Sequence, residues 1–300
     1  MNFMIPRFLF LILLAATALA EPPKKAPARP HDEKTATPRM PVAGQPFDDS
    51  EMVRYLEVEG RKLFAAGKVK PLGGSLARRC SLRLTDASAE KLPLTEAAKR
   101  AEAATVVLGE FFKDKKTTGF SSAAGGFFIT ETGVLVTSLH VLGEKDSRGF
   151  VAMLRDGRVF AVRETLAADP VDDLVVLQLD VPEGTKLPAL TLAAEPAPAG
   201  TSVGVMSHPE EHFYLLTTGV VGRHTVWRED KGESHFMSIN ADFAKGSSGC
   251  PVFDERGVVV GVVNNTESIY YDDDGKRRQT DLQMVVKNVT PSWVVRRLFQ

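Results

Sequence analysis

The stretch GGFFITETGVLVTSLHVL, residues Gly125–Leu142, decides the fold. It contains two apolar runs, Gly126–Thr130 and Val134–Thr137. Runs rich in β-branched and aromatic residues, bounded by turn residues, are typical of paired β-strands. The stretch therefore predicts a hairpin whose second strand ends in Thr137–Val141.

Similar β-rich runs continue on both sides of this hairpin, from Ala104 onward. Turn signals such as Asp156-Gly157 and Gly257 separate them. Strands at this density predict barrels or a sandwich rather than a doubly wound sheet. The other predicted strands are Thr105–Phe112, Phe150–Leu154, Val159–Glu164, Leu174–Leu179, Thr201–Met206, Tyr214–Val221, Phe236–Asn240, Pro251–Phe253, Val258–Asn264 and Leu282–Val286.

Helical patterns flank the strand-rich region. Apolar residues at helical spacing predict a helix near Asp49–Ala66, with Ser50 as its cap, and a short one at Thr95–Ala104. A further helix is expected to close the chain, with Thr290 as cap and Pro291 at the first helical position.

The composition excludes a collagen-like, a coiled-coil or a wholly disordered chain. The 300 residues are 43% apolar and 25% charged, which is ordinary for a soluble globular protein. The net charge of −1 offers no basic excess for nucleic-acid binding, and none is expected. Two cysteines, Cys80 and Cys250, cannot form a disulfide framework, so a buried core must hold the fold. Whether these two pair stays open.

Residues 1–20 have the form of a secretory signal peptide. Arg7 is their only charge, the apolar run Phe8–Ala16 follows, and Ala18-Leu19-Ala20 has the small-x-small pattern of a cleavage site. A retained membrane anchor is the alternative, but the run is shorter than the ~20 residues that a spanning helix needs. We therefore expect a secreted or periplasmic protein that is not inserted in the membrane after cleavage.

Three segments carry side chains that could perform chemistry. They contain His140, the pair Asp172 and Asp173, and the pair Ser247 and Ser248. Taken singly, these residues are typical of a core histidine, a solvated acid and a polar turn. Together they fit nucleophilic catalysis, because a serine needs a base, the base needs an orienting partner, and the oxyanion needs N–H donors.

The three segments resemble the motifs of chymotrypsin-fold serine proteases, most of all bacterial trypsin-like proteases of the HtrA/Deg type. Thr137–Val141 matches Thr-x-x-His-Val, Asp169–Leu174 matches Asp-Pro-x-x-Asp-Leu, and Gly246–Pro251 matches Gly-x-Ser-Gly-x-Pro. The order His…Asp…Ser, with separations of 33 and 75 residues, is similar to that of compact bacterial members. The resemblance covers Ala104–Gln300.

The resemblance implies an all-β fold of two six-stranded β-barrels of chymotrypsin type, with a C-terminal helix, a partly helical N-terminal extension and the site between the barrels. It implies a serine endopeptidase that works through an acyl-enzyme. Ser248 would be the nucleophile, His140 the general base and Asp173 its orienting partner. The N–H groups of Gly246 and Ser248 would form the oxyanion hole. No cofactor and no metal are expected.

The chain departs from the family pattern at two positions. Cys250 stands where the family usually has glycine. The larger side chain could distort the turn at Gly246–Ser248, which would form the oxyanion hole. Two other functions therefore stay open: a non-catalytic barrel that binds peptides or proteins, and an esterase with the same triad. Ser247 stands where digestive relatives carry an aspartate, so activation through that ion pair is not expected. The PDZ module of bacterial relatives is expected to be absent.

The substrate is expected to be a protein or peptide in extended conformation. Val263 and Asn264 are the candidate edge strand that would pair with its backbone. Asp242 is the candidate base of the primary pocket, where an acid would select Lys or Arg. The alternative is that Asp242 only caps its loop. The oligomeric state is not predicted.

Two segments resemble the sequence patterns of metal-binding sites. His208–His212 fits the H-x-x-E-H pattern of some zinc peptidases, but Pro209 favours a connecting loop. Asp272–Arg278, in the run YDDDGKRR from Tyr271, contains three aspartates that could bind calcium, but a solvated hairpin tip is favoured.

The predicted division of the chain is a signal peptide at residues 1–20, a flexible Pro-rich linker at 21–46, an N-terminal extension without an assigned role at 47–103, and the protease-like domain at 104–300.

Overall fold

The computed structural model describes residues 39, 45–72, 77–115, 117–143, 146–229, 232–273 and 279–299. The described residues belong to one compact unit, Pro38–Gln300. The predicted signal peptide and all but three residues of the predicted linker lie outside the described residues. No helix within the described ranges has the length and apolar character needed to cross a membrane.

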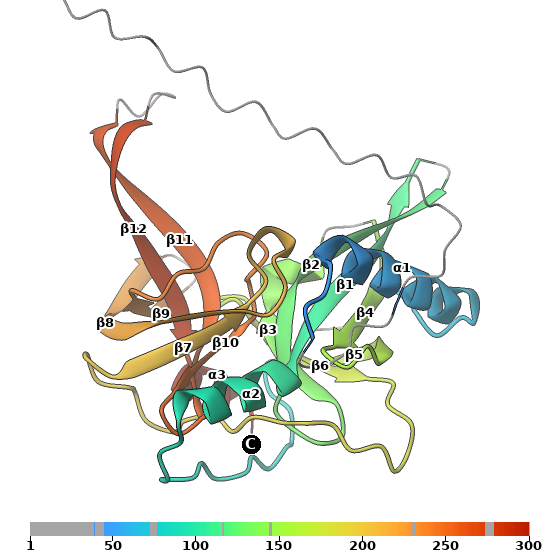
Figure 1. Cartoon of the computed structure of the whole chain (residues 1–300), viewed down its shortest axis with the longest axis horizontal. Helices are drawn as coiled ribbons and strands as arrows, with labels where there is room; N and C mark the ends of the chain where they lie inside the picture. The colour runs from blue at the N-terminus through green and yellow to red at the C-terminus, as the bar shows by residue number, and fades with distance from the viewer. Residues whose placement is uncertain are drawn as a thin grey trace, which may run out of the picture. The chain divides into compact units, whose positions relative to one another are not determined.

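Twelve strands form two closed antiparallel barrels (Figure 1), in the order β1-β2-β3-β6-β5-β4 and β10-β11-β12-β9-β8-β7. The predicted architecture of two six-stranded barrels is thus confirmed. The first barrel contains β1 (Thr105–Asp114), β2 (Thr117–Phe128), β3 (Val134–Ser138), β4 (Ser147–Leu154), β5 (Val159–Asp169) and β6 (Leu174–Leu179). The second contains β7 (Ser202–Ser207), β8 (Leu215–Glu229), β9 (Gly232–Ile239), β10 (Pro251–Asp254), β11 (Val259–Asp273) and β12 (Gln279–Pro291).

Each barrel is filled by side chains from its own strands. Leu135, Val175 and Leu177 are fully buried in the first barrel, and Val252 and Met237 in the second. Burial of a side chain of this size contributes roughly 1.5–3 kcal/mol. The β-rich sequence runs therefore become strands because closing the barrels removes their apolar side chains from water.

Several strands are longer than their apolar runs predict. β2 begins at Thr117, and its polar first half is held by pairing with β1, as in Phe120 opposite Phe111. β11 and β12 extend beyond the second barrel as a two-stranded ribbon (Figure 1). Main-chain pairing rather than burial supports these extensions, so the hydrophobic pattern does not reveal them.

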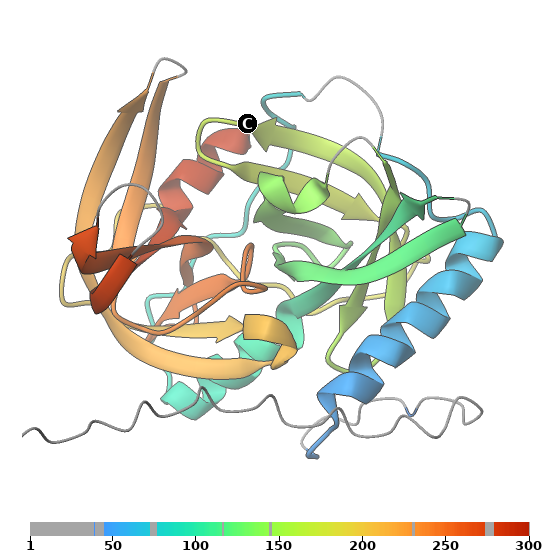
Figure 2. The same ribbon diagram turned by 90° about the horizontal axis from the view of Figure 1, so that it is seen from above.

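The N-terminal extension contributes one helix to each barrel. Helix α1 (Asp49–Ala65) contacts β1, β2 and β5, and helix α2 (Leu94–Ala104) contacts β7 and β10. Both helices are visible from a second direction in Figure 2. The cap of α1 is Asp48 rather than the expected Ser50, because the Asp48 carboxylate accepts the N–H of Ser50 at 2.9 Å.

The C-terminal end differs from its prediction. β12 continues to Pro291, and only the short α3 (Ser292–Val295) and a 3₁₀ turn follow. Pro291 is the N-cap, whereas Thr290 stays in the strand and donates its hydroxyl to the carbonyl of Asp172 at 3.2 Å. Thr290 is therefore used to fasten the second barrel to the first rather than to cap a helix.

Candidate active site

His140 and Asp173 come from adjacent ends of the first barrel. His140 lies in a 3₁₀ turn, Leu139–Leu142, directly after β3. Asp173 lies directly before β6, which pairs with β3. Between β5 and β6, the Asp169 carboxylate accepts the N–H of Val171 at 2.9 Å, which makes the tight turn that its Asp-Pro sequence favours. The pairing of β3 with β6 therefore brings histidine and aspartate together.

Both oxygens of the Asp173 carboxylate hold His140. Oδ2 lies 2.6 Å from His140 Nδ1, and Oδ1 accepts the His140 main-chain N–H at 2.9 Å. The side-chain amide of Asn264 also reaches Oδ2, at 3.3 Å, from β11 of the other barrel. Such contacts fix the ring orientation and make Nδ1 the protonated nitrogen of the neutral imidazole.

The second ring nitrogen of His140 contacts Ser248. His140 Nε2 lies 2.9 Å from Ser248 Oγ, within hydrogen-bond reach. The hydrogen bond to Asp173 raises the pKa of His140 above its ordinary value of 6.5, and it outweighs the opposing effect of partial burial. The three predicted side chains therefore form one connected chain of hydrogen bonds across the two barrels.

Asp172 and Ser247, the neighbours of Asp173 and Ser248, form no hydrogen bond with His140 in the described part of the chain. Asp172 is nearly fully buried, and its carboxylate accepts the main-chain N–H of His235 at 2.8 Å. Desolvation raises the pKa of this carboxyl. The side chain of Ser247 is fully buried, and its hydroxyl has no hydrogen-bond partner among the described residues. The geometry thus distinguishes Asp173 and Ser248 from their neighbours.

The turn before β10 presents two free main-chain donors. Within the described chain, the N–H groups of Gly246 and Ser248 donate to no other residue, whereas the N–H of Ser247 is bonded to Ala244. Gly246 has a φ of +92°, and a Cβ there would lie 2.7 Å from the carbonyl oxygen of His208. Only glycine fits this position. The turn therefore leaves the N–H groups of Gly246 and Ser248 available as hydrogen-bond donors.

Cys250 is accommodated without disturbing this turn. Its side chain is fully buried, and a Cβ on Gly125 would lie only 2.1 Å from its Sγ. The missing side chain at Gly125 thus provides the space that the thiol fills. Cys80 and Cys250 are both free cysteines, so they do not pair. Burial strongly raises the pKa of the Cys250 thiol, which keeps it protonated and unreactive.

The three candidate substrate-binding residues lie in different settings. Val263 is buried, its N–H is bonded to Cys250, and its carbonyl accepts from Gly249 and from the hydroxyl of Ser138. Its main-chain donor is therefore already used, which disagrees with its expected place on a free strand edge. Asn264 lies at a bulge between the residues of β11 that pair with β12, and its side chain faces Asp173.

Asp242 does not lie in a buried pocket. Its side chain is 85% exposed, and its carboxylate lies 3.6 Å from the ammonium of Lys287. The Lys287 side chain is only 12% exposed and also donates to the carbonyl of Phe243. An exposed and paired carboxylate attracts a basic side chain only weakly.

In the zinc-like segment His208–His212, the first histidine forms hydrogen bonds within the protein. His208 is buried, its Nδ1 accepts the N–H of Tyr214 at 3.0 Å, and its Nε2 lies 3.2 Å from the carbonyl of Val106. Burial lowers the pKa of His208 to about 4, so the ring is neutral at neutral pH. His212 is exposed instead. The calcium-like segment Asp272–Arg278 lies mostly outside the described residues.

Sequence reasoning missed two contributors to the site. Asn264 was expected to meet substrate, yet its amide contacts Asp173. His208–His212 was expected to be only a connecting loop, yet the N–H of Glu210 donates to the carbonyl of Lys245 at 2.7 Å, next to Gly246. Neither contact leaves a local signal, since each joins residues that are far apart in the chain.

Comparison with known proteins shows which proteins this chain is similar to in sequence and in fold. Residues 124–262 match the family model described as a trypsin-like peptidase domain. A Sinorhizobium fredii protein, the uncharacterized y4bJ, is 31% identical over 148 residues, which is 48% of this chain and 22% of that protein. A Halomonas elongata protein described as a probable periplasmic serine endoprotease DegP-like is 31% identical over 47% of this chain and 29% of its own length.

Among solved structures, the HtrA-type protease AlgW with decapeptide superimposes with a TM-score of 0.52 at 20% identity, covering 68% of this chain and 65% of that one. This likeness concerns the fold. The matches to the two bacterial proteins span less than a third of either protein's length. Residues 124–262 are therefore similar to a trypsin-like peptidase domain, and this part of the chain resembles DegP-like serine endoproteases in sequence and an HtrA-type protease in fold.

Proposed function

We propose that this protein is a serine endopeptidase. The observation that carries the proposal is the unbroken chain from Asp173 through His140 to Ser248, at 2.6 Å and 2.9 Å. Ser248 would attack the scissile carbonyl while His140 Nε2 takes its proton. Asp173 would hold the ring and stabilise the imidazolium that forms.

The remaining steps follow from the same atoms. The oxyanion of the tetrahedral intermediate would accept the N–H groups of Gly246 and Ser248. His140 would then return its proton to the leaving amine, which releases the first product and leaves an acyl group on Ser248. Water, activated by the same imidazole, would attack this ester and restore the free serine.

The substrate is proposed to be an extended peptide or an unfolded protein. The solved relative AlgW carries a decapeptide, which supports a peptide as ligand of this fold. The site of action is proposed to lie outside the cytoplasm. The signal-like first twenty residues and the periplasmic description of the Halomonas elongata relative support this location.

The test is a peptide-library digest with the mature chain and two serine variants. Ser248→Ala should abolish cleavage, because no nucleophile remains. Ser247→Ala is the matched control: it removes the adjacent hydroxyl, which is buried without a partner, and should cleave at nearly the wild-type rate. Equal cleavage by wild type and Ser248→Ala would contradict the proposal, and so would the absence of any cleavage by folded wild-type protein.

A further inference from the structure

We infer that Asp49 of helix α1 is a positioning residue for the oxyanion hole: it holds the 208–214 segment, which in turn fixes the Lys245–Gly246 peptide with its N–H toward the reacting carbonyl. The inference rests on the proposed endopeptidase function, and it assigns a role to the N-terminal extension. Three links carry it, each between residues of different elements.

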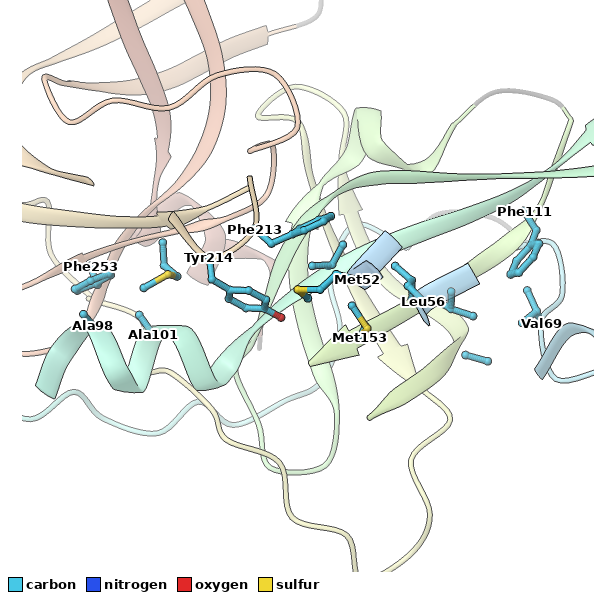
Figure 3. Close-up of a cluster of buried hydrophobic side chains, with 14 of the residues drawn as sticks. Met52, Leu56, Val69, Ala98, Ala101, Phe111, Met153, Phe213, Tyr214 and Phe253 are labelled. Atoms are coloured by element: carbon cyan, nitrogen blue, oxygen red, sulfur yellow. The ribbon is translucent and has the colours of Figure 1, made fainter. Parts of the chain in front are cut away.

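The first link joins α1 to the 208–214 segment. Asp49 Oδ1 accepts the main-chain N–H of Phe213 at 3.2 Å, and Oδ2 lies 3.5 Å from His212 Nδ1. The ring of Phe47 meets Tyr214 edge to face, with centroids 6.4 Å apart. Figure 3 shows Met52 of α1 beside Phe213 and Tyr214 in one buried cluster. The N-terminal end of α1 is therefore fastened to this segment by polar and apolar contacts.

The second link is the unusual backbone of the segment itself. Glu210, Glu211 and Tyr214 have φ values of +47°, +65° and +56°. Side chains other than glycine rarely adopt this region, at a cost on the order of 1–3 kcal/mol for each residue. A segment with three such residues keeps its shape only where neighbours hold it. His208 holds it from one side through the N–H of Tyr214, and Asp49 holds it from the other.

The third link joins the segment to the oxyanion turn. The N–H of Glu210 donates to the carbonyl of Lys245 at 2.7 Å. In a trans peptide the carbonyl and the following N–H point in opposite directions. This bond therefore turns the N–H of Gly246 away from the 208–214 segment and leaves it free for an oxyanion. If the segment relaxed, the Lys245–Gly246 peptide could rotate and this donor would be lost.

Steady-state kinetics on the full mature chain test the inference with three variants. Asp49→Ala removes the acceptor of the Phe213 N–H, and Asp49→Asn keeps an amide oxygen at the same place. Glu51→Ala is the matched control, since Glu51 is an exposed acid in the same first turn of α1. Loss of an oxyanion donor lowers kcat by about 10²–10³-fold, so partial misplacement in Asp49→Ala should lower kcat by roughly 10-fold or more. KM should stay nearly unchanged, while Asp49→Asn and Glu51→Ala should stay near wild type.

Amide hydrogen exchange supplies a readout that does not depend on catalysis. Asp49→Ala should speed exchange in the 208–214 segment, and at the Glu210 N–H in particular, whereas Glu51→Ala should not. Unchanged exchange in Asp49→Ala would overturn the inference whether or not the wild type cleaves peptides. Faster exchange with an unchanged kcat would overturn the positioning role alone. An inactive wild type would instead contradict the proposed function, and the exchange experiment would still decide whether Asp49 holds the segment.

Discussion

At the scale of single residues, the site depends on how Asp173 holds His140. The carboxylate contacts both the ring and the main-chain N–H of the histidine, and Asn264 adds a third donor from the second barrel. In the proposed mechanism, a base held in this way would need no reorientation to take the proton of Ser248. The same hydrogen bond favours the protonated ring, so the aspartate also sets the pH at which the base becomes available.

The first prediction concerns this pH dependence. The pKa of His140 is raised above 6.5, and only the neutral ring can act as base. Activity should therefore be lost as the pH falls through a value above 6.5 and regained as it rises. Asp173→Asn removes the carboxylate, so the acidic limb should move to lower pH while kcat falls by about 10⁴-fold. Profiles of kcat/KM against pH for both proteins measure this, and an unmoved limb in Asp173→Asn would contradict it.

The second prediction concerns substrate preference. Asp242 is 85% exposed and paired with Lys287, so screening leaves it little influence on a bound side chain. Asp242→Asn should change the ratio of kcat/KM for Arg and Leu substrates by less than about 2-fold. Paired fluorogenic peptides that differ only at the residue before the scissile bond give this ratio. A fall of about tenfold, worth about 1.4 kcal/mol, would show that Asp242 selects basic residues after all.

At the scale of elements, strand β2 of the first barrel packs against the turn Gly246–Cys250 of the second barrel. Gly125 of β2 lies directly against Cys250, and its main-chain N–H donates to the carbonyl of Ser248 at 3.0 Å. A strand of one barrel thus carries part of the turn that belongs to the other. The space left by the missing side chain of Gly125 on β2 is filled by the Cys250 thiol of this turn.

The third prediction tests this fit. A methyl group at Gly125 would lie 2.1 Å from Cys250 Sγ, so Gly125→Ala should lower the free energy of unfolding by about 1–3 kcal/mol. Adding Cys250→Ala removes the sulfur and should restore part of that loss. Urea unfolding of the two single variants and the double variant gives the coupling energy. Strictly additive effects would mean that the two residues do not share this space.

At the scale of the whole molecule, a buried neutral histidine lies where the two barrels and the 208–214 segment meet. His208 contacts the carbonyl of Val106 in β1 and the N–H of Tyr214, and both ring nitrogens are thereby occupied. Protonation of the ring would remove the acceptor that Tyr214 needs and place a charge in an apolar cluster. Folding therefore favours the neutral ring, in the same segment that supports the oxyanion turn.

The fourth prediction follows from linkage. The pKa of His208 is about 4 in the folded chain and about 6.5 when unfolded, so between these values the unfolded chain binds more protons. The free energy of unfolding should therefore fall as the pH drops from 6.5 to 4, by about 3 kcal/mol from this residue. Urea unfolding of the wild type and His208→Gln at pH 7 and 4.5 isolates this contribution. Equal losses of stability in the two proteins would contradict it.

Much of this molecule could be predicted from its sequence. Every apolar run named as a strand overlaps a strand, because buried side chains and turn residues such as Gly257 leave a local pattern. The motifs around His140, Asp173 and Ser248 also predicted three side chains that the fold brings together, with Asp173 and Ser248 each within hydrogen-bond distance of His140. The contacts of Asn264 with Asp173 and of Asp49 with Phe213 could not be predicted, because each joins residues at least 90 positions apart. Strand extensions such as the first half of β2 were missed because main-chain pairing holds them without an apolar pattern.

The most direct test of the central claim is the attachment site of a fluorophosphonate probe on the folded mature protein, mapped by peptide mass spectrometry. The account predicts labelling at Ser248 and not at Ser247, because only the Ser248 hydroxyl lies beside His140 Nε2. Labelling should be lost in His140→Ala, which removes the base, and in urea-unfolded protein, where His140 is separated from Ser248. Absence of label in the folded wild type, or attachment at another residue, would contradict the account.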